Sequence, residues 1–156
     1  MEHKLVVLEW LYKADQDFGY AGLGLADESG YYDQICFLLQ QAVEKYLKAY
    51  IVANDLKFAK EHSLVKLLDE CVRADISLDK LQSECRFLTA FYFEVRYPDE
   101  PFIVATKEQA EKALKAADAV QTEIRKRLGI EGEVTAEMVR EEDKKVEEEM
   151  KIAGGL

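Results

Sequence analysis

Apolar side chains recur at intervals of three and four residues between Tyr31 and Ala53, which is the spacing of one face of an α-helix. The stripe consists of Ile35, Leu38, Leu39, Ala42, Val43, Tyr46, Leu47 and Tyr50. It covers more than half of the helical circumference, so we expect other helices to surround this one. A central helix of this kind predicts an all-helical bundle.

Similar stripes predict four further helices. The first covers about residues 5–27, the third about residues 64–72 with Ser63 as its N-cap, and the fourth residues 77–97. Pro98 disfavours helical geometry at the residue before it, which is why the fourth helix should end there. The fifth begins at a capping box, Thr106-Lys-Glu-Gln109, and ends at Gly129. The fold class predicted is all-α, an up-and-down four-helix bundle with an extra short helix and a charged C-terminal helix or tail.

Two polar strips lie beside the apolar stripes. The strip on the first helix consists of Lys13, Asp15, Gln16 and Asp17, which we expect to face solvent or a partner. The strip on the central helix consists of Gln40, Gln41, Glu44, Lys45 and Lys48. Its members Gln41 and Lys45, and Glu44 and Lys48, have i,i+4 spacing. The central strip either forms a solvated face or borders a cleft or a dimer interface.

The composition changes at residue 129. Residues 129–156 hold nine acidic and four basic side chains, and their apolar stripe is sparse. We therefore divide the chain into a helical bundle, residues 1–128, and an acidic C-terminal helix or tail, residues 129–156. The tail is expected to be a mobile, highly charged helix that docks on a partner subunit.

The net charge of the chain is −10. A chain this acidic is a poor electrostatic partner for nucleic-acid backbones, so any RNA contact would be local, and a protein partner or a small ligand fits the charge better. Cys36, Cys71 and Cys85 fall on apolar stripes and are expected to be reduced core thiols, which fits a cytoplasmic protein. No uncharged stretch is long enough to span a membrane. No motif for a cofactor or a metal is present, so none is expected.

One segment is not explained by packing. Residues 91–102, FYFEVRYPDEPF, place Glu94, Arg96, Tyr97 and Asp99 where a helix should end and two prolines stiffen the chain. The guanidinium of Arg96 suits a phosphate or carboxylate, and Tyr97 can stack on a base or donate to a phosphate. The alternative is that Arg96 pairs with Asp99 or Glu94 and only fixes the helix end.

His62 is the second candidate, since an imidazole can act as an acid or a base near neutral pH. The alternative role is that of a histidine at a helix start that hydrogen-bonds a neighbouring backbone carbonyl.

These residues together resemble the HEPN domain family (higher eukaryotes and prokaryotes nucleotide-binding) over about residues 5–128. The resemblance is carried by four blocks: Trp10 with Ala14 and Asp15, CFLLQQAVEKYLKAYIV at 36–52, His62-Ser63-Leu64, and Arg96-Tyr97-Pro98-Asp99. The family implies a four-helix core with an added short helix, usually dimeric. It is also similar to the helical C-terminal domain of kanamycin nucleotidyltransferase.

Many members of this family are metal-independent ribonucleases, often toxins or parts of defence systems. They use an arginine, a polar residue, and a histidine four to six residues after that arginine, paired across a dimer. Arg96 is the candidate for the arginine, but residues 97–103 contain no histidine. The acid or base that cleavage needs is therefore absent from its expected place.

Other members carry no nuclease activity and are partners of minimal nucleotidyltransferases, in split enzymes or toxin–antitoxin pairs. The Arg96-Tyr97-Pro98-Asp99 ending is typical of this group. The resemblance favours a non-catalytic homodimeric subunit that binds nucleotide phosphate or a nucleotidyltransferase through Arg96, Tyr97 and Asp99, with His62 and Lys45 nearby.

Two alternatives stay open. In the first, the chain is a ribonuclease toxin with a degenerate site, in which Arg96 stabilises the phosphorane charge and His62 or Tyr97 moves protons. In the second, it is a structural dimer whose polar cluster only fixes a helix end.

Overall fold

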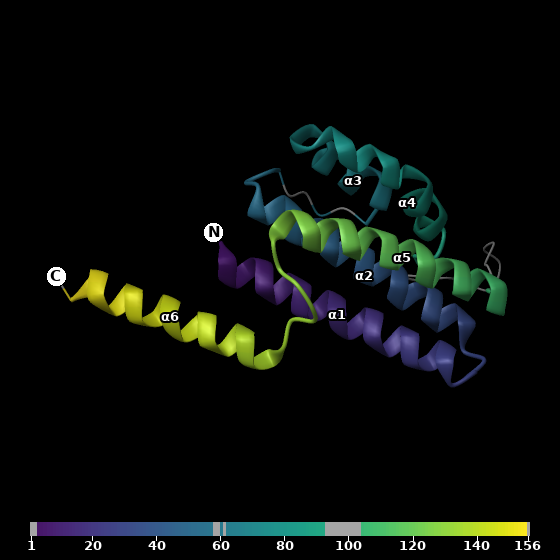
Figure 1. Ribbon diagram of the computed structural model, residues 1–156, viewed down its shortest axis with the longest axis horizontal. Coiled ribbons are helices and arrows are strands. Elements are labelled where there is room, and N and C mark those ends of the chain that lie inside the picture. The colour runs from purple at the N-terminus through teal and green to yellow at the C-terminus, as the bar shows by residue number, and fades with distance from the viewer. Residues whose placement is uncertain (1–2, 58–59, 61, 93–103, 156) are drawn as a thin grey trace.

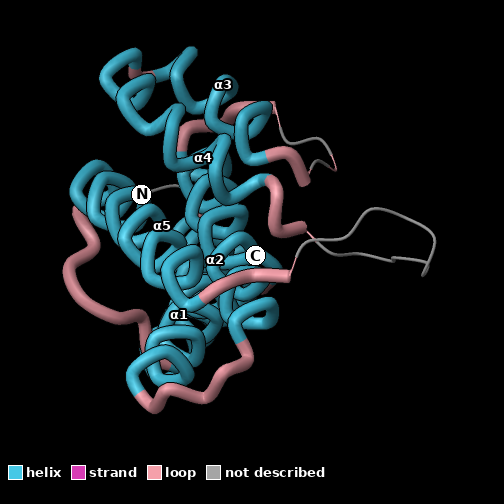
Figure 2. Tube along the Cα trace, turned by 90° about the vertical axis from the view of Figure 1, so that its right-hand side faces the viewer, coloured by secondary structure: helices cyan, strands magenta, loops and turns pink. Residues whose placement is uncertain are grey.

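The computed structural model describes residues 3–57, 60, 62–92 and 104–155, and the described part of the chain is helical without a strand. The elements in chain order are α1 (Lys4–Ala26), α2 (Tyr32–Ala53), α3 (Leu64–Ala74), the 3-10 helix η1 (Ile76–Leu81), α4 (Gln82–Thr89), α5 (Lys107–Leu128) and α6 (Ala136–Gly154). Figures 1 and 2 show α3 and α4 on one side of the molecule and α1 on the other, with α2 and α5 between them. The predicted all-α bundle is confirmed.

Helix α2 is the centre of the fold. It contacts α1, α3, α4 and α5, and thirteen of its 22 residues are buried. Tyr46, Leu47 and Ile51 are completely inaccessible to solvent. Because apolar positions cover most of its circumference, this helix is stable only when other helices enclose it, as its sequence predicts.

The predicted helix ends are confirmed where side chains cap them. The Ser63 hydroxyl accepts the Lys66 N–H at the start of α3. Thr106 and Gln109 form both hydrogen bonds of a capping box at the start of α5. Gly129 ends α5 with φ +66°, a left-handed conformation that favours glycine.

The prediction that the fourth helix runs to residue 97 is wrong, because α4 ends at Thr89. The Thr89 hydroxyl donates to the Cys85 carbonyl within the last turn, and the Phe91 N–H bonds the Leu88 carbonyl in a tight turn. This turn buries Phe91, which keeps 2% of its surface exposed.

Asp15 is also not at the surface, although the sequence predicted that the polar strip of the first helix faces solvent or a partner. Its residue exposure is 5%, so it lies in the interior rather than toward solvent. The hydroxyl of Tyr46 donates to its carboxylate at 2.6 Å, which provides the partner that a buried charge requires.

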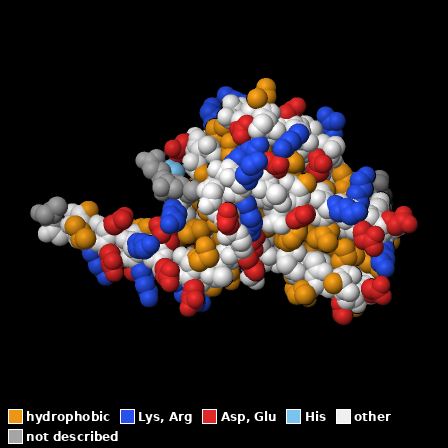
Figure 3. Space-filling view, in the orientation of Figure 1, with side chains coloured by type: hydrophobic (Ala, Val, Ile, Leu, Met, Phe, Trp, Pro, Cys, Tyr) orange, Lys and Arg blue, Asp and Glu red, His pale blue; other side chains and the backbone are white. Residues whose placement is uncertain are grey.

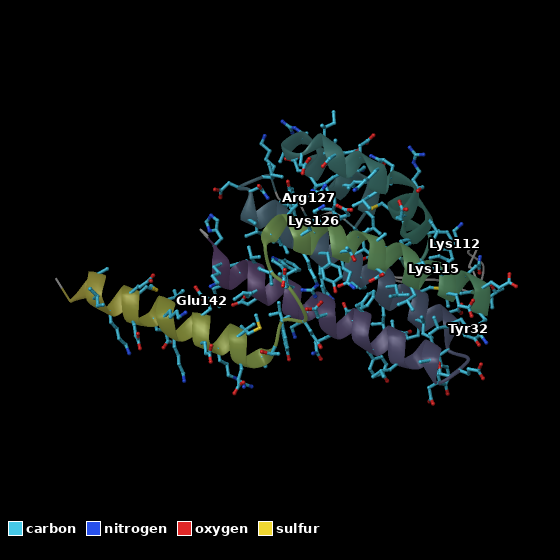
Figure 4. The ribbon with its side chains drawn as sticks, in the orientation of Figure 1. Tyr32, Lys112, Lys115, Lys126, Arg127 and Glu142 are labelled. Atoms are coloured by element: carbon cyan, nitrogen blue, oxygen red, sulfur yellow. The ribbon has the colours of Figure 1, made fainter. Side chains whose placement is uncertain are left out.

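Helix α6 packs along α1 and then continues past the N-terminus of α1 (Figure 1). Lys4 and Glu142 form an ion pair of 3.6 Å at the point where the two helices part. Figure 4 labels Glu142 on this helix. None of the 19 residues of α6 is fully buried. None of the helices in the described ranges has the length and apolarity needed to cross a membrane.

Candidate functional site

His62 lies just before α3 and faces the side of α2. Its Nδ1 atom is 2.7 Å from Oε1 of Glu44, a hydrogen-bonding distance. The side chain of His62 is half exposed, at 48%, whereas the Glu44 residue keeps 4% of its surface. An imidazole is thus held at the surface by a carboxylate in the interior.

The carboxylate of Glu44 has a second partner on its own helix. Nζ of Lys48 lies 3.5 Å from Oε2 of Glu44, one helical turn along α2. Lys48 is itself 7% exposed, and its ammonium lies 5.4 Å from the centre of the Trp10 ring on α1. Buried charges persist when they are paired, and the aromatic face adds a cation–π attraction to the ammonium.

The backbone of His62 is fixed as well as its side chain. Nε2 of Gln40, a fully buried residue of α2, donates to the His62 carbonyl at 3.2 Å. Nε2 of Gln41 in turn donates to Oε1 of Gln40 at 2.7 Å. The amide of Gln40 therefore holds the backbone at His62, and the amide of Gln41 fixes that of Gln40.

An aromatic ring covers one face of the imidazole. The rings of His62 and Tyr92 are stacked with centroids 4.6 Å apart and an interplanar angle of 14°. Tyr92 also lies 6.4 Å from the Phe37 ring of α2. Because α4 ends at Thr89, the chain turns early enough to bring Tyr92 back onto His62.

The predicted site residues fall into three groups. Arg96, Tyr97 and Asp99 lie outside the described residues. His62 forms the site just described. The ammonium of Lys45 pairs with the carboxylate of Asp17 on α1.

The polar strip of α2 is largely interior. The sequence predicted either a solvated face or the border of a cleft or interface. Gln40, Glu44 and Lys48 are buried: Gln40 and Glu44 hydrogen-bond His62, and the ammonium of Lys48 lies over the ring of Trp10. The sequence signal for a shared polar cluster was the i,i+4 spacing of Gln40, Glu44 and Lys48, which places the three side chains in one line along the helix. Glu44 and Gln40 are the site residues that the sequence did not reveal.

A second polar network joins α1, α2, α5 and the segment before α6. Asp15 accepts hydrogen bonds from Tyr46, from the guanidinium of Arg125, and from the Val134 N–H at 2.8 Å. Burial, together with the adjacent Asp15, raises the pKa of Tyr46 above its ordinary value. A cleft of about 920 Å³ opens beside it, lined in part by Gly19. With all three donors satisfied by one carboxylate, this network connects helices rather than presenting reactive groups.

A third network ties α5 to η1. The guanidinium of Arg127 donates to Asp75 at 2.7 Å and to the hydroxyl of Ser77 at 2.7 Å, and it pairs with Glu123. Figure 4 labels Arg127 near the end of α5. Hydrogen bonds from Ser77 and Arg127 lower the pKa of Asp75 to about 2. Hydrogen bonds from Lys80 and Arg127 likewise lower the pKa of Glu123 to about 2.

The three cysteines are buried and unpaired, as predicted. Burial raises the pKa of each of Cys36, Cys71 and Cys85 to about 12, which keeps the thiols protonated and unreactive. Among the residues that the structure describes, no three histidine, cysteine or acidic side chains gather in a way that could hold a metal ion. The described groups that contact the His62 ring are a carboxylate, that of Glu44, and the aromatic ring of Tyr92.

Comparison with known proteins gives the family. The HEPN domain model matches residues 7–127. The structure is similar to TT1696 from Thermus thermophilus, with 28% identity, a TM-score of 0.66, and coverage of 77% of this chain and 96% of that one. It is also similar to ST0689, an archaeal HEPN homologue, with 25% identity, a TM-score of 0.62, and coverage of 78% and 96%. No curated protein matches the chain. Since the family model covers most of the chain, this protein belongs to the HEPN domain family.

Proposed function

We propose that this protein is a non-catalytic HEPN subunit, a homodimer that binds either nucleotide or a minimal nucleotidyltransferase, the latter as in toxin–antitoxin pairs. The observation that carries the proposal is the immobilised imidazole of His62, held through Nδ1 by Glu44 and stacked on Tyr92. A group fixed on its side chain, its ring face and its backbone is preorganised for binding.

The position of Tyr92 relates this imidazole to the other candidate residues. The segment that carries Arg96, Tyr97 and Asp99 starts directly after Tyr92, whose ring lies on His62. In the proposed site the fork of Arg96 binds phosphate oxygens, and His62 and Tyr97 contribute hydrogen bonds or stacking to the base. Lys45 of α2, which pairs with Asp17 of α1, is the further cation proposed near this site.

Two properties of the sequence favour binding over cleavage. Residues 97–103 contain no histidine, so the acid or base of the ribonuclease members is missing from its place after Arg96. The net charge of −10 opposes binding of a long nucleic acid but allows a nucleotide or a protein partner.

Calorimetric titration with adenosine nucleotides and with a cognate nucleotidyltransferase tests the proposal. We expect saturable binding by the wild type and at least a tenfold loss of affinity in His62→Ala and in Arg96→Ala. The matched controls are His3→Ala and Arg73→Ala, both at exposed positions outside the site, and they should bind as the wild type does. If the wild type bound neither the nucleotides nor the nucleotidyltransferase, the proposal would be contradicted. Lost stability in Arg96→Ala without any ligand effect would instead identify a structural dimer.

One observation favours a second candidate, a metal-independent ribonuclease. The Nδ1 contact between His62 and Glu44 is the arrangement in which a carboxylate orients a histidine base. In such a reaction His62 would take the proton of the RNA 2′-hydroxyl as its oxygen attacks the adjacent phosphorus. The bond from phosphorus to the 5′-oxygen would break, with Tyr97 giving a proton to the leaving oxygen, and Arg96 would stabilise the phosphorane.

Incubation with single-stranded and structured RNA in the presence of a chelator separates the two candidates. The binding proposal predicts intact RNA with wild type, His62→Ala and Arg96→Ala. Cleavage by the wild type that disappears in His62→Ala, with the variant still folded, would establish the ribonuclease instead.

A further inference from the structure

An apolar groove lies at the end of the bundle where α1 meets α2. Its volume is about 820 Å³, and Tyr20, Leu23 and Tyr31 line it while exposing 71%, 71% and 75% of their surfaces. Eight large apolar side chains are exposed in the described part of the chain, and three of them meet at this groove. Figure 3 shows hydrophobic side chains at the end of the body that lies opposite α6. A concentration of this kind is typical of a surface that another molecule covers.

The groove is poor in charge. Asp27 is the one charged residue among the ten described residues that line it, whereas 33% of the whole chain is charged. The centre of a protein–protein interface is depleted of charged residues in the same way. Two copies of a chain with a net charge of −10 repel each other, so they associate most readily through a face where few charges meet. This composition favours a second copy of the chain over a charged peptide or a nucleic acid.

The two walls of the groove match each other along its length. Each wall is one helical face with residues spaced by three and four: Tyr20, Leu23 and Asp27 on α1, and Tyr31, Gln34 and Leu38 on α2. Because α1 and α2 are antiparallel neighbours joined by a short turn, Asp27 lies at the level of Tyr31, and Tyr20 at the level of Leu38. A two-fold axis that runs along the groove sets the α1 wall of one copy on the α2 wall of the other and keeps these levels.

Apolar groups and charges are both complementary in that arrangement. The ring of Tyr20 in one copy meets Leu38 of the second copy, and Leu23 meets the methylene groups of Gln34. The carboxylate of Asp27 faces the hydroxyl of Tyr31 of the second copy, which can donate a hydrogen bond to it. The two Asp27 side chains lie on opposite sides of the axis, so like charges do not meet.

We propose that two copies of this chain associate face to face through the groove, with α1 of each copy on α2 of the other. The proposal rests on the homodimer of the proposed function and names its interface. The same two walls are used twice, once in each direction, and an isologous contact of this kind closes a two-fold dimer. Helix α6 leaves the bundle at the other end of α1 in Figure 1, so it does not cover the groove.

Disulfide trapping between two different chains tests the contact directly. An equal mixture of Leu23→Cys and Gln34→Cys chains should form a covalent dimer of one chain of each kind under mild oxidation, whereas neither chain alone should cross-link to that extent. The three native cysteines are buried and do not interfere. The control mixture pairs Gln34→Cys with Ile76→Cys, because Ile76 is 82% exposed but lies on η1, outside the groove. Equal cross-linking in the two mixtures, or none in the first, would overturn the proposal.

Light scattering separates this interface from the homodimer itself. The wild type should be a dimer and Leu23→Asp a monomer, because the new carboxylate enters the apolar contact near Asp27. The matched control, Ile76→Asp, should stay dimeric. A wild-type monomer would overturn both this interface and the homodimer of the proposed function. A dimer that Leu23→Asp leaves intact would overturn the interface alone, and if that variant lost its binding to the nucleotidyltransferase, the groove would be the site of the transferase instead.

Discussion

Nδ1 of His62 lies 2.7 Å from Oε1 of Glu44, across the boundary between a half-exposed side chain and the interior. The pair joins the segment before α3 to the central helix. The same carboxylate also neutralises Lys48, so one acid supports two basic groups. Three of the predictions below concern buried or strongly hydrogen-bonded charges of this kind.

Glu44→Ala should destabilise the fold by about 3 kcal/mol, because it leaves the ammonium of Lys48 buried without its carboxylate. Glu44→Gln should cost less, since the amide still hydrogen-bonds His62. Urea unfolding followed by circular dichroism measures both. The control is Glu70→Ala, which breaks surface contacts, among them the pair with Arg73, and should change the free energy of unfolding by less than about 1 kcal/mol. If Glu44→Ala and Glu70→Ala lowered the free energy of unfolding equally, the buried pair of Glu44 and Lys48 would be contradicted.

Asp15→Asn should loosen the segment that leads to α6. Asp15 accepts from Tyr46, Arg125 and the Val134 N–H, and an asparagine has a single acceptor oxygen for these three donors. We expect a loss of about 3 kcal/mol and faster hydrogen exchange at the Val134 amide. Asp118→Asn is the control, because Asp118 is exposed and accepts only from Gln121 among the hydrogen bonds described. Unchanged exchange at Val134 would show that Asp15 does not hold this segment.

The stability of the fold should decline in acid through the network around Arg127. The pKa of Asp75 and that of Glu123 are each about 2 in the folded chain, below their ordinary values of 3.8 and 4.5. A lowered folded pKa means that the stabilisation is complete above the ordinary values and is lost as the pH falls toward about 2. Urea midpoints measured between pH 5 and pH 2 should therefore fall, and they should fall less steeply in Arg127→Gln. A wild-type slope in Arg127→Gln, or a flattened slope in the surface control Arg73→Gln, would contradict this assignment.

The native thiols should resist alkylation near neutral pH. Burial raises the pKa of Cys36, Cys71 and Cys85 to about 12, and all three are inaccessible to solvent. Iodoacetamide should label none of them in the folded protein at about pH 8 and all three in denaturant, as mass spectrometry would show. Rapid labelling of one cysteine without denaturant would reveal a local opening around that residue.

The fold was readable from the sequence because its helix signals are local. The stripe of α2, the Thr106 capping box and Gly129 each determine a helix or its end through neighbours within a few residues. The end of α4 at Thr89 was not readable, because no proline, glycine or capping side chain marks it in the sequence. Pro98 set the latest residue at which that helix could end, not the actual one.

The candidate site was readable only in part. His62 stood out as a histidine next to a helix N-cap, but its partners Glu44 and Gln40 lie about 20 residues earlier. Their polarity suggested a solvated strip or the border of a cleft or interface, because a sequence shows the charge of a side chain but not the distant group that it satisfies. The same limit applies to Lys45 and Asp15, which turned out to pair across helices.

Nuclear magnetic resonance of the two histidines is the most direct test of the central claim, that His62 belongs to a nucleotide-binding site. The chain contains only His3 and His62, so imidazole-labelled protein gives one site signal and one internal control. Titration with adenosine monophosphate should shift the His62 signals saturably and leave those of His3 unchanged. Signals of His62 that do not move, or that move no more than those of His3, would contradict the account.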